Sequence, residues 1–342
     1  MRYQLLGNSG LRVSELCLGT MTFGETWGWG ASREQSLRQF DLFAEAGGNF
    51  IDTSVNYTDG TSESLLGEFL GLERDRFVLA TKYSLTGKQS TDPNSGGNSR
   101  KSMHRAIETS LKRLQTDFID LLYLHMWDYL TPVDEVMRGL DDLVSAGKVL
   151  YLGFSNTPDW IVAEANTLAE LRGWSRPVAL QVPYSIADRA VERSLLPMAK
   201  HWEMAVLAWG ILEAGLLTGK YVVRTSEPTR LNQDTLTINE RTLAIVHELE
   251  AVANQVGRSL AQVAINWVRQ QRRQGQLIPV LGARTAAQLQ DNLGVLEWDL
   301  SEDQLSRLAQ VGQIDLGFPH GFLEGNPNIF GATYPLIDAR LP

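Results

Sequence analysis

The chain has 342 residues, of which 43% are hydrophobic and 21% charged, and its formal net charge is −9. These proportions are ordinary for a globular protein, and an acidic chain without a basic cluster argues against a nucleic-acid partner. Cys17 is the only cysteine, so no disulfide forms within the chain, and no apolar run is long enough to span a membrane. We expect a cytoplasmic protein without a signal peptide and without a metal site.

Short apolar segments alternate with amphipathic segments along the chain. We expect strands at 14–18, 50–52, 77–81, 119–125, 149–154, 179–182, 205–209 and 277–281. We expect helices between them at 33–46, 62–70, 100–114, 132–146, 158–171, 191–201, 240–254 and 285–293. Strands that are apolar on both faces and separated by helices indicate a parallel sheet. Eight such units fit a (β/α)₈ TIM barrel, although an open doubly wound sheet would show the same alternation.

Further elements interrupt this repeat. The opening segment YQLLGNSGLRV predicts a β-hairpin at the floor of the barrel, and extra helices are expected at 259–271 and 301–311. Because the α/β barrel uses a chain of this length as one unit, we expect a single domain over residues 1–342.

Four polar residues follow or end successive predicted strands. Asp52 and Tyr57 stand in NFIDTSVNY, Lys82 in VLATKY and His125 in DLLYLHMWD. Singly, each has a structural explanation: a turn residue, a packed ring, a solvated lysine or a hydrogen-bonded core histidine. In a TIM barrel, however, the C-terminal ends of the strands carry the catalytic groups. Together the four residues therefore predict an active site.

Their chemistry suits the reduction of a carbonyl group. Addition of hydride produces an alkoxide, which needs a proton and a donor aimed at the developing charge. A tyrosine has a pKa of about 10, and a neighbouring lysine lowers it. We therefore expect Tyr57 to donate the proton, Lys82 to lower the pKa of Tyr57, and Asp52 to keep Lys82 in place and charged. His125 is expected to orient the substrate oxygen.

These segments, with GKVLYLGFSN, LQVPYS, VLAWGILEAGLLTGKY and IPVLGARTAAQLQDN, resemble the aldo-keto reductase family in order and spacing over almost the whole chain. The resemblance implies a catalytic tetrad of Asp52, Tyr57, Lys82 and His125. It implies an NADPH cofactor bound across the barrel mouth without a Rossmann fold, and reduction of a small aldehyde or ketone to an alcohol. It also implies that the C-terminal tail, residues 312–342, closes the mouth.

The resemblance further assigns cofactor contacts in groups. It implies cofactor contacts at Gly19, Thr20, Met21 and Asp52. It implies that Ser155, Asn156 and Gln181 hold the nicotinamide carboxamide, with Trp209 stacked on the ring. It implies pyrophosphate contacts at Gly210, Leu212, Gly215 and Lys220, although WGILEAG replaces a Ser-Pro pair frequent in relatives. It implies adenosine contacts at Gly282, Arg284, Gln288, Asp291 and Asn292. Arg284 suits a 2′-phosphate, which favours NADP over NAD.

Several alternatives stay open at this point. Ser155 and Asn156 could form a simple helix cap, Trp209 could lie in the core, and Arg284 could pair with Asp291. We expect Trp27, Tyr83 and Trp127 to line an apolar substrate pocket, but each could instead pack against the barrel.

Two other functions compete with the reductase. The potassium-channel β subunits share the fold and tetrad and act partly as cofactor-binding regulatory partners. A different barrel enzyme could use Lys82 as a Schiff-base lysine. The physiological substrate, the direction of the reaction and the oligomeric state are not predicted.

Overall fold

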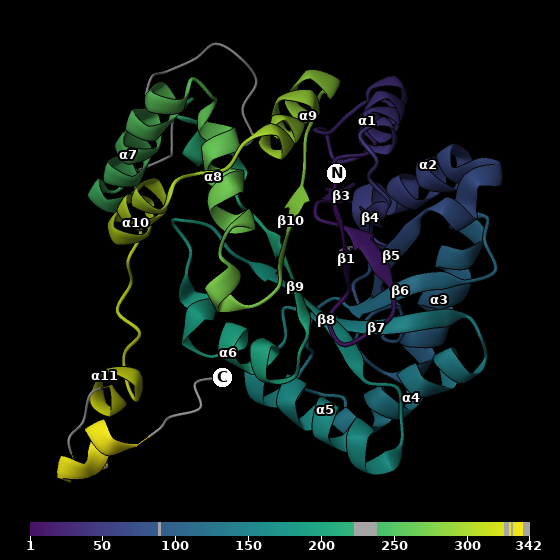
Figure 1. Cartoon of the computed structure of the whole chain (residues 1–342). Helices are drawn as coiled ribbons and strands as arrows, with labels where there is room; N and C mark the ends of the chain where they lie inside the picture. The colour runs from purple at the N-terminus through teal and green to yellow at the C-terminus, as the bar shows by residue number, and fades with distance from the viewer. Residues whose placement is uncertain (88–89, 222–237, 325–327, 330, 338–342) are drawn as a thin grey trace.

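The computed structural model describes residues 1–87, 90–221, 238–324, 328–329 and 331–337. Eight parallel strands close into a barrel in the order β10-β3-β4-β5-β6-β7-β8-β9 (Figure 1). They are β3 (Cys17–Gly19), β4 (Phe50–Asp52), β5 (Val78–Tyr83), β6 (Ile119–Leu124), β7 (Val149–Ser155), β8 (Pro177–Pro183), β9 (Ala205–Trp209) and β10 (Leu277–Leu281). The pairing of β10 with β3 closes the sheet. The expected TIM barrel is confirmed, and the open sheet is excluded.

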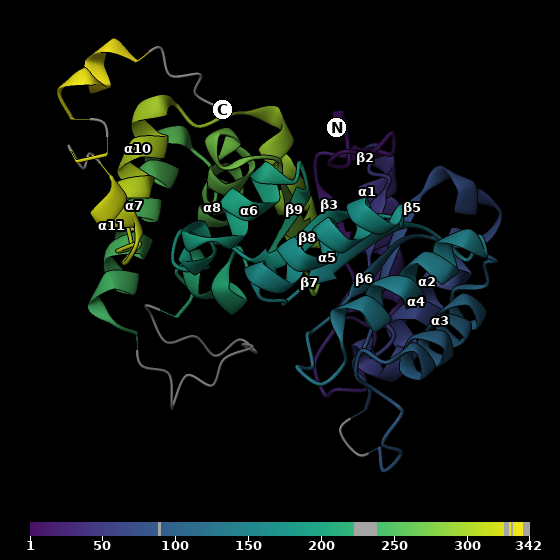
Figure 2. The ribbon, with the colours of Figure 1, turned by 90° about the horizontal axis from the view of Figure 1, so that it is seen from below.

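Helices surround the strands (Figures 1 and 2). Several of them begin with a side-chain cap. The helices are α1 (Arg33–Glu45), α2 (Thr61–Leu70), α3 (Arg100–Leu114), α4 (Val133–Ser145), α5 (Asp159–Arg172), α6 (Leu195–His201), α7 (Glu240–Val256), α8 (Leu260–Arg269), α9 (Ala286–Leu293), α10 (Glu302–Val311) and α11 (His320–Leu323). Side chains that accept a hydrogen bond from the third helical N–H are those of Ser32, Ser99, Asn239, Ser259, Thr285 and Ser301. Such bonds satisfy N–H groups that the helix itself leaves free.

The expected N-terminal hairpin is present and covers the floor of the barrel. Its strands are β1 (Tyr3–Leu5) and β2 (Arg12–Ser14). Gly7, in the turn, has a φ of 52°, and a Cβ there would lie 2.3 Å from the carbonyl oxygen of Val178 and 2.8 Å from the amide nitrogen of Ala205. The turn thus presses against the starts of β8 and β9. The first predicted strand was wrong at one end, because Ser14 belongs to the hairpin and the barrel strand starts at Cys17.

Alternation along each barrel strand separates two apolar layers. One fills the barrel and includes Phe50, Val78, Ala80, Leu121, Tyr123, Ala179, Ala205 and Leu207. The other lies between strands and helices and includes Leu79, Tyr83, Leu122, Leu124, Leu180 and Val206. Because successive side chains of a strand point to opposite faces, residues at even spacing from the interior set also face the interior. This rule decides which residues at the strand ends face the barrel mouth.

The described part of the C-terminal tail runs from α10 along the outer edge of the molecule and lies away from β4 to β6 in both views (Figures 1 and 2). Its contacts include one between the backbone oxygen of Asp315 and Arg193, just before α6. Phe318 and Phe322 are 87% and 66% exposed. Closure of the mouth by this tail therefore stays a prediction.

In the described ranges, no helix is both long enough and apolar enough to cross a membrane. A group of His, Cys, Asp and Glu side chains that could hold a metal ion is likewise missing from these residues.

Candidate active site

The four predicted catalytic residues come together at the C-terminal end of the barrel. Asp52 ends β4 and Lys82 lies near the end of β5, both on the interior side. The ammonium of Lys82 donates to Asp52 Oδ2 at 2.6 Å, to the hydroxyl of Tyr57 at 3.0 Å and to the backbone oxygen of Thr53 at 2.9 Å. The three donors of the lysine are thus each directed at a fixed oxygen.

Burial sets the protonation of Tyr57. The hydroxyl lies among buried groups, and the ring is only 9% exposed. Burial raises the pKa of Tyr57, the charge of Lys82 lowers it, and the net direction is upward. The expected lowering effect of Lys82 on this pKa is present, but the cost of removing a phenolate from water outweighs it. Tyr57 is a neutral phenol that holds its proton at neutral pH.

Lys82 keeps its charge although its side chain is fully buried. Burial acts to lower the pKa of Lys82, but the charge of Asp52 and the neighbouring Tyr57 outweigh it, so the pKa is raised. A Schiff-base lysine must be neutral to attack a carbonyl. The pairing with Asp52 therefore argues against the alternative of a Schiff-base enzyme.

His125 follows β6 and faces Tyr57, with the two ring centroids 5.8 Å apart and the planes at 81°. Burial first, and then the charge of Lys82, hold the pKa of His125 well below its ordinary value. The imidazole is therefore neutral. Its Nδ1 lies 3.1 Å from the hydroxyl oxygen of Ser54, which leaves Nε2 as the second polar atom of the ring.

The residues expected at the nicotinamide lie beside this tetrad. Gln181, on β8, donates to Asp52 Oδ1 at 2.8 Å, so that its amide is joined directly to the tetrad. Asn156 donates to the backbone oxygen of His125 and to the hydroxyl of Ser155, both at 2.9 Å. By strand alternation the side chains of Ser155 and Gln181 lie on the interior side of their strands. A hydroxyl and a carboxamide are groups that can bind the two polar atoms of a planar carboxamide, so this contact stays a prediction.

Trp209 lies at the end of β9, two residues beyond Leu207 of the barrel interior, and its side chain is on the same face of the strand. It is 40% exposed, unlike the buried aromatic residues of the core. Tyr184 anchors its backbone by donating an N–H to its carbonyl at 3.0 Å. An exposed ring at the mouth fits a stacking platform better than a core position. The fit to a bound nicotinamide stays a prediction.

The expected phosphate and adenosine residues follow the two neighbouring strands β9 and β10. Among the residues that the structure describes, a Cβ at Gly210 or at Gly282 would meet no atom within 4 Å. Gln288, in the first turn of α9, accepts the backbone N–H of Arg284 at 2.9 Å. The half-buried Arg284 thus stands at a helix N-terminus, where backbone N–H groups and the helix dipole favour an anion. The arrangement suits the 2′-phosphate of NADP.

Other members of these groups have internal roles. Asp291 accepts hydrogen bonds from Ser259 at 2.7 Å and Gln262 at 2.8 Å, which joins α9 to α8. Asn292 is buried, Leu212 packs against the core, and the chain of Lys220 lies against Gly215. Their cofactor contacts stay predictions.

The first barrel strand contributes support to Asp52. Thr20 is fully buried, and both its N–H and its hydroxyl donate to the backbone oxygen of Asp52 at 2.9 Å. Gly19 lies so close to β10 that a Cβ would be 2.7 Å from Val280 Cγ1. Met21 is half-buried. Thr20 therefore positions the tetrad, and cofactor contacts at these three residues stay predictions.

Comparisons with known proteins agree with this geometry. Residues 15–313 match the Aldo/keto reductase family. The chain belongs to this family. It is 38% identical to an aryl-alcohol dehydrogenase [NADP(+)] of Phanerodontia chrysosporium, over 93% of this chain and 87% of that protein. It is also 38% identical to a norsolorinic acid reductase of Aspergillus flavus, over 94% of this chain and 84% of that protein. The expected oxidoreductase class and its NADP(H) cofactor are thereby confirmed.

The three residues predicted to line the substrate pocket of this aldo-keto reductase differ from one another in burial and in contacts. Trp27 meets Tyr57 edge to face, with ring centroids 6.5 Å apart, and contacts Trp29 at 5.8 Å. Trp127 is 8% exposed, so most of its ring packs in the core. Tyr83 is fully buried in the layer between strands and helices. Its selection was wrong, because Lys82 faces the interior and the next residue of a strand must face the opposite way.

Some residues around the site were not predicted from the sequence. Thr53 and Ser54 directly follow Asp52, and their position in the segment DTSVNY was the available signal. Glu63 and Arg113, behind the tetrad, come from two helices 50 positions apart and share a contact of 3.3 Å. No motif spacing connects them, so the sequence offered no signal for this pair.

Proposed function

We propose that this aldo-keto reductase reduces an aldehyde or ketone to an alcohol with NADPH, and that Tyr57 is the general acid. The observation that carries the proposal is the Tyr57 hydroxyl, 3.0 Å from the ammonium of Lys82, which in turn is 2.6 Å from Asp52. A protonated phenol beside a buried, paired cation can release its proton into a site where the resulting negative charge is stabilised.

NADPH, when bound, supplies the hydride that adds to the carbonyl carbon. Tyr57 then gives its proton to the carbonyl oxygen, and negative charge develops on its own oxygen. Lys82 is fixed beside that oxygen before the proton moves, so little reorganisation is needed. Asp52 holds Lys82 in place through the bond to Oδ2, while Gln181 holds Asp52 through the bond to Oδ1.

His125 orients the carbonyl oxygen in this proposal. To donate a hydrogen bond from Nε2, the neutral ring must carry its proton there, and Nδ1 must accept one. Ser54, with its hydroxyl 3.1 Å from Nδ1, supplies that donor. The same hydroxyl also lies within donating distance of Asn56 Oδ1, at 2.7 Å, and of the backbone oxygen of Lys82, at 3.5 Å. Donation to His125 selects the tautomer that the reaction needs.

We further propose aromatic carbonyl compounds as the first substrates to test. The names of the relatives above refer to an aryl alcohol and to norsolorinic acid. In this chain, Trp27 and Trp29 form an aromatic wall that touches the Tyr57 ring. Aromatic rings bury large area and pair favourably at centroid distances of about 4.5–7 Å.

The test is the single-turnover oxidation of NADPH with a panel of aromatic aldehydes, ketones and aliphatic aldehydes, followed by absorbance in a stopped-flow instrument. Tyr57→Phe keeps the ring but removes the proton, and should lower the rate about 10²- to 10⁴-fold. Its affinity for NADPH should be unchanged. The matched control is Tyr151→Phe, the same change at a half-buried tyrosine in the N-terminal half of β7.

A Tyr57→Phe variant that keeps the rate of the parent would disprove the role of general acid. Tight NADPH binding without turnover of any carbonyl in the panel would instead favour a cofactor-binding regulatory protein, the function of the potassium-channel β subunits.

A further inference from the structure

A second ion pair, whose carboxylate is buried, lies next to the tetrad, on the outer side of the barrel. The side chain of Glu63, in α2, is fully buried. One carboxylate oxygen accepts a hydrogen bond from the Thr81 hydroxyl at 2.8 Å, and the other accepts one from Arg113, in α3, at 3.3 Å. Thr81 directly precedes Lys82 in β5. The carboxylate is therefore attached to the strand that carries the lysine of the tetrad.

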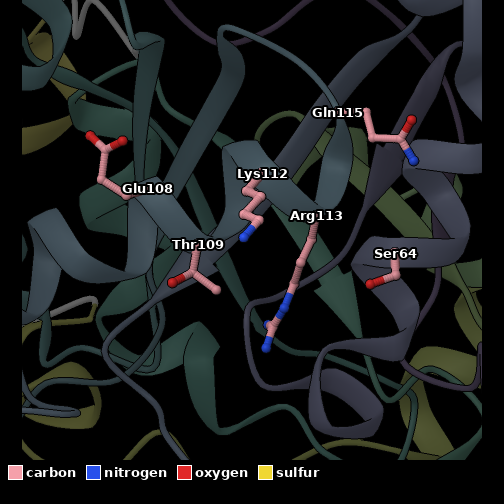
Figure 3. A pocket seen from close by; sticks show the side chains of 6 residues that line it. All are labelled: Ser64, Glu108, Thr109, Lys112, Arg113 and Gln115. Carbon is pink, nitrogen blue, oxygen red and sulfur yellow. The ribbon is translucent and has the colours of Figure 1, made fainter.

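Arg113 attaches the same pair to the segment that carries Tyr57. Its Nη1 also donates to the backbone oxygen of Val55 at 2.7 Å, two residues before Tyr57. Its guanidinium lies against Gly60, three residues after Tyr57, where a Cβ would be 2.2 Å from Cζ. Figure 3 shows Arg113 extended away from its helix, in a groove whose other lining residues are Ser64, Glu108, Thr109, Lys112 and Gln115.

The backbone between these two contacts is strained. Tyr57 is followed by Thr58, Asp59 and Gly60 with φ values of 45°, 56° and 94°. Non-glycine residues adopt this left-handed region at an energetic cost and keep it only where the surroundings fix them. Thr58 is fixed on the other side of the turn, where its hydroxyl donates to the backbone oxygen of Phe23 at 2.6 Å. The turn that aims Tyr57 is thus held from both flanks.

We propose that Glu63 and Arg113 form a positioning pair, which keeps the Tyr57 hydroxyl within hydrogen-bond distance of Lys82 during proton transfer. The pair joins β5 to the turn at 55–60, the two segments whose relative placement sets the distance between these groups. It acts through their backbone rather than by contact with substrate. Displacement of a reacting group by about 1 Å can cost about a hundredfold in rate. This inference rests on the proposed role of Tyr57 as the acid.

The double variant Glu63→Gln/Arg113→Met tests the pair, because it removes both charges and leaves no buried carboxylate unpaired. We expect the single-turnover rate of NADPH oxidation to fall about ten- to a hundredfold. The Kd for NADPH should change by less than about twofold, since the pair lies outside the mouth. Arg113→Lys keeps the charge but loses the planar fork, and should lower the rate by about three- to tenfold.

The matched control is a second, mostly buried ion pair, which contacts β5 at its N-terminal end. Arg74 donates to Asp120 Oδ2 at 2.7 Å, and that oxygen also accepts the N–H of Leu79, in β5, at 2.9 Å. The two side chains are 12% and 11% exposed. Since the N-terminal face of a barrel serves stability, Arg74→Met/Asp120→Asn should lower Tm and leave the rate within about twofold of the parent.

Parental rate in Glu63→Gln/Arg113→Met would overturn the proposal. So would an equal loss of rate in the two double variants, because the pair would then act only on stability. If Glu63→Gln/Arg113→Met does not fold, Arg113→Lys decides, and a parental rate in that variant overturns the proposal. Failure of the proposed function would show differently, as a Tyr57→Phe variant that keeps the parental rate.

Discussion

Replacement of Lys82 by methionine measures how much the buried cation assists Tyr57. The two groups are 3.0 Å apart. At an effective dielectric constant of about 20, a full negative charge on the phenol oxygen would gain about 5 kcal/mol from the lysine. If about half of that charge has developed in the transition state, the loss is about 2.5–3 kcal/mol, or about a hundredfold in rate.

The assay is single-turnover NADPH oxidation as a function of pH. Burial, partly offset by Lys82, raises the pKa of Tyr57 above its ordinary value. Because the acid must be protonated, the rate should be constant through neutral pH and fall only above the ordinary tyrosine pKa of about 10. Removal of Lys82 removes the cation that favours the phenolate, so the fall should move to still higher pH.

The double variant Asp52→Asn/Lys82→Met is the control for the orphaned carboxylate, because Lys82→Met alone leaves Asp52 buried without its cation. Both variants should show a similar loss of rate if the cation itself is what matters. A Lys82→Met protein that folds and reduces substrate within about threefold of the parent would refute the electrostatic argument.

Two further predictions concern the cofactor and the histidine. Arg284→Ala should weaken NADPH binding about ten- to a hundredfold and leave NADH binding nearly unchanged, as measured by equilibrium titration, because a charge-assisted contact contributes about 1.5–3 kcal/mol; equal losses for both cofactors would contradict the 2′-phosphate assignment. Since burial and Lys82 lower the pKa of His125, stability should be full above the unfolded-state pKa of about 6.5 and decline as the pH falls below it. His125→Gln should lose less Tm between pH 7 and 5 than the parent, and an equal loss would count against a buried neutral imidazole.

The barrel and tetrad could be predicted from the sequence because their signals are local. Strands that are apolar on both faces alternate with helices. Asp52, Lys82 and His125 each stand at or near the end of such a strand. In a closed parallel barrel all these ends meet on one face. Three separate local patterns therefore implied one site, and the distances between the side chains confirm that they meet.

The sequence was less informative in two situations. One is the side of a strand that a residue faces, which changes with a shift of one position; the other is a pKa on which burial and a neighbouring charge act in opposite directions. Tyr83 was placed in the substrate pocket although it is adjacent to Lys82 and must face the helices. The lowering effect of Lys82 on the pKa of Tyr57 was expected, but burial outweighs it, and composition does not reveal burial. The Glu63–Arg113 pair depends on the packing of α2 against α3, and neither helix carries a pattern that identifies its partner.

In strand β5, the contacts at the N-terminal end differ from those at the C-terminal end, where the tetrad lies. At its start, the N–H of Leu79 is bonded to Asp120, which pairs with Arg74. Near its end, Thr81 points outward to Glu63 and Lys82 points inward to Asp52 and Tyr57. Alternation forces these two neighbours to opposite faces, so a contact made in the helical layer fixes the strand position of the buried lysine. Thr81, which contacts Glu63, therefore directly precedes Lys82 in β5 and lies on the opposite face of the strand.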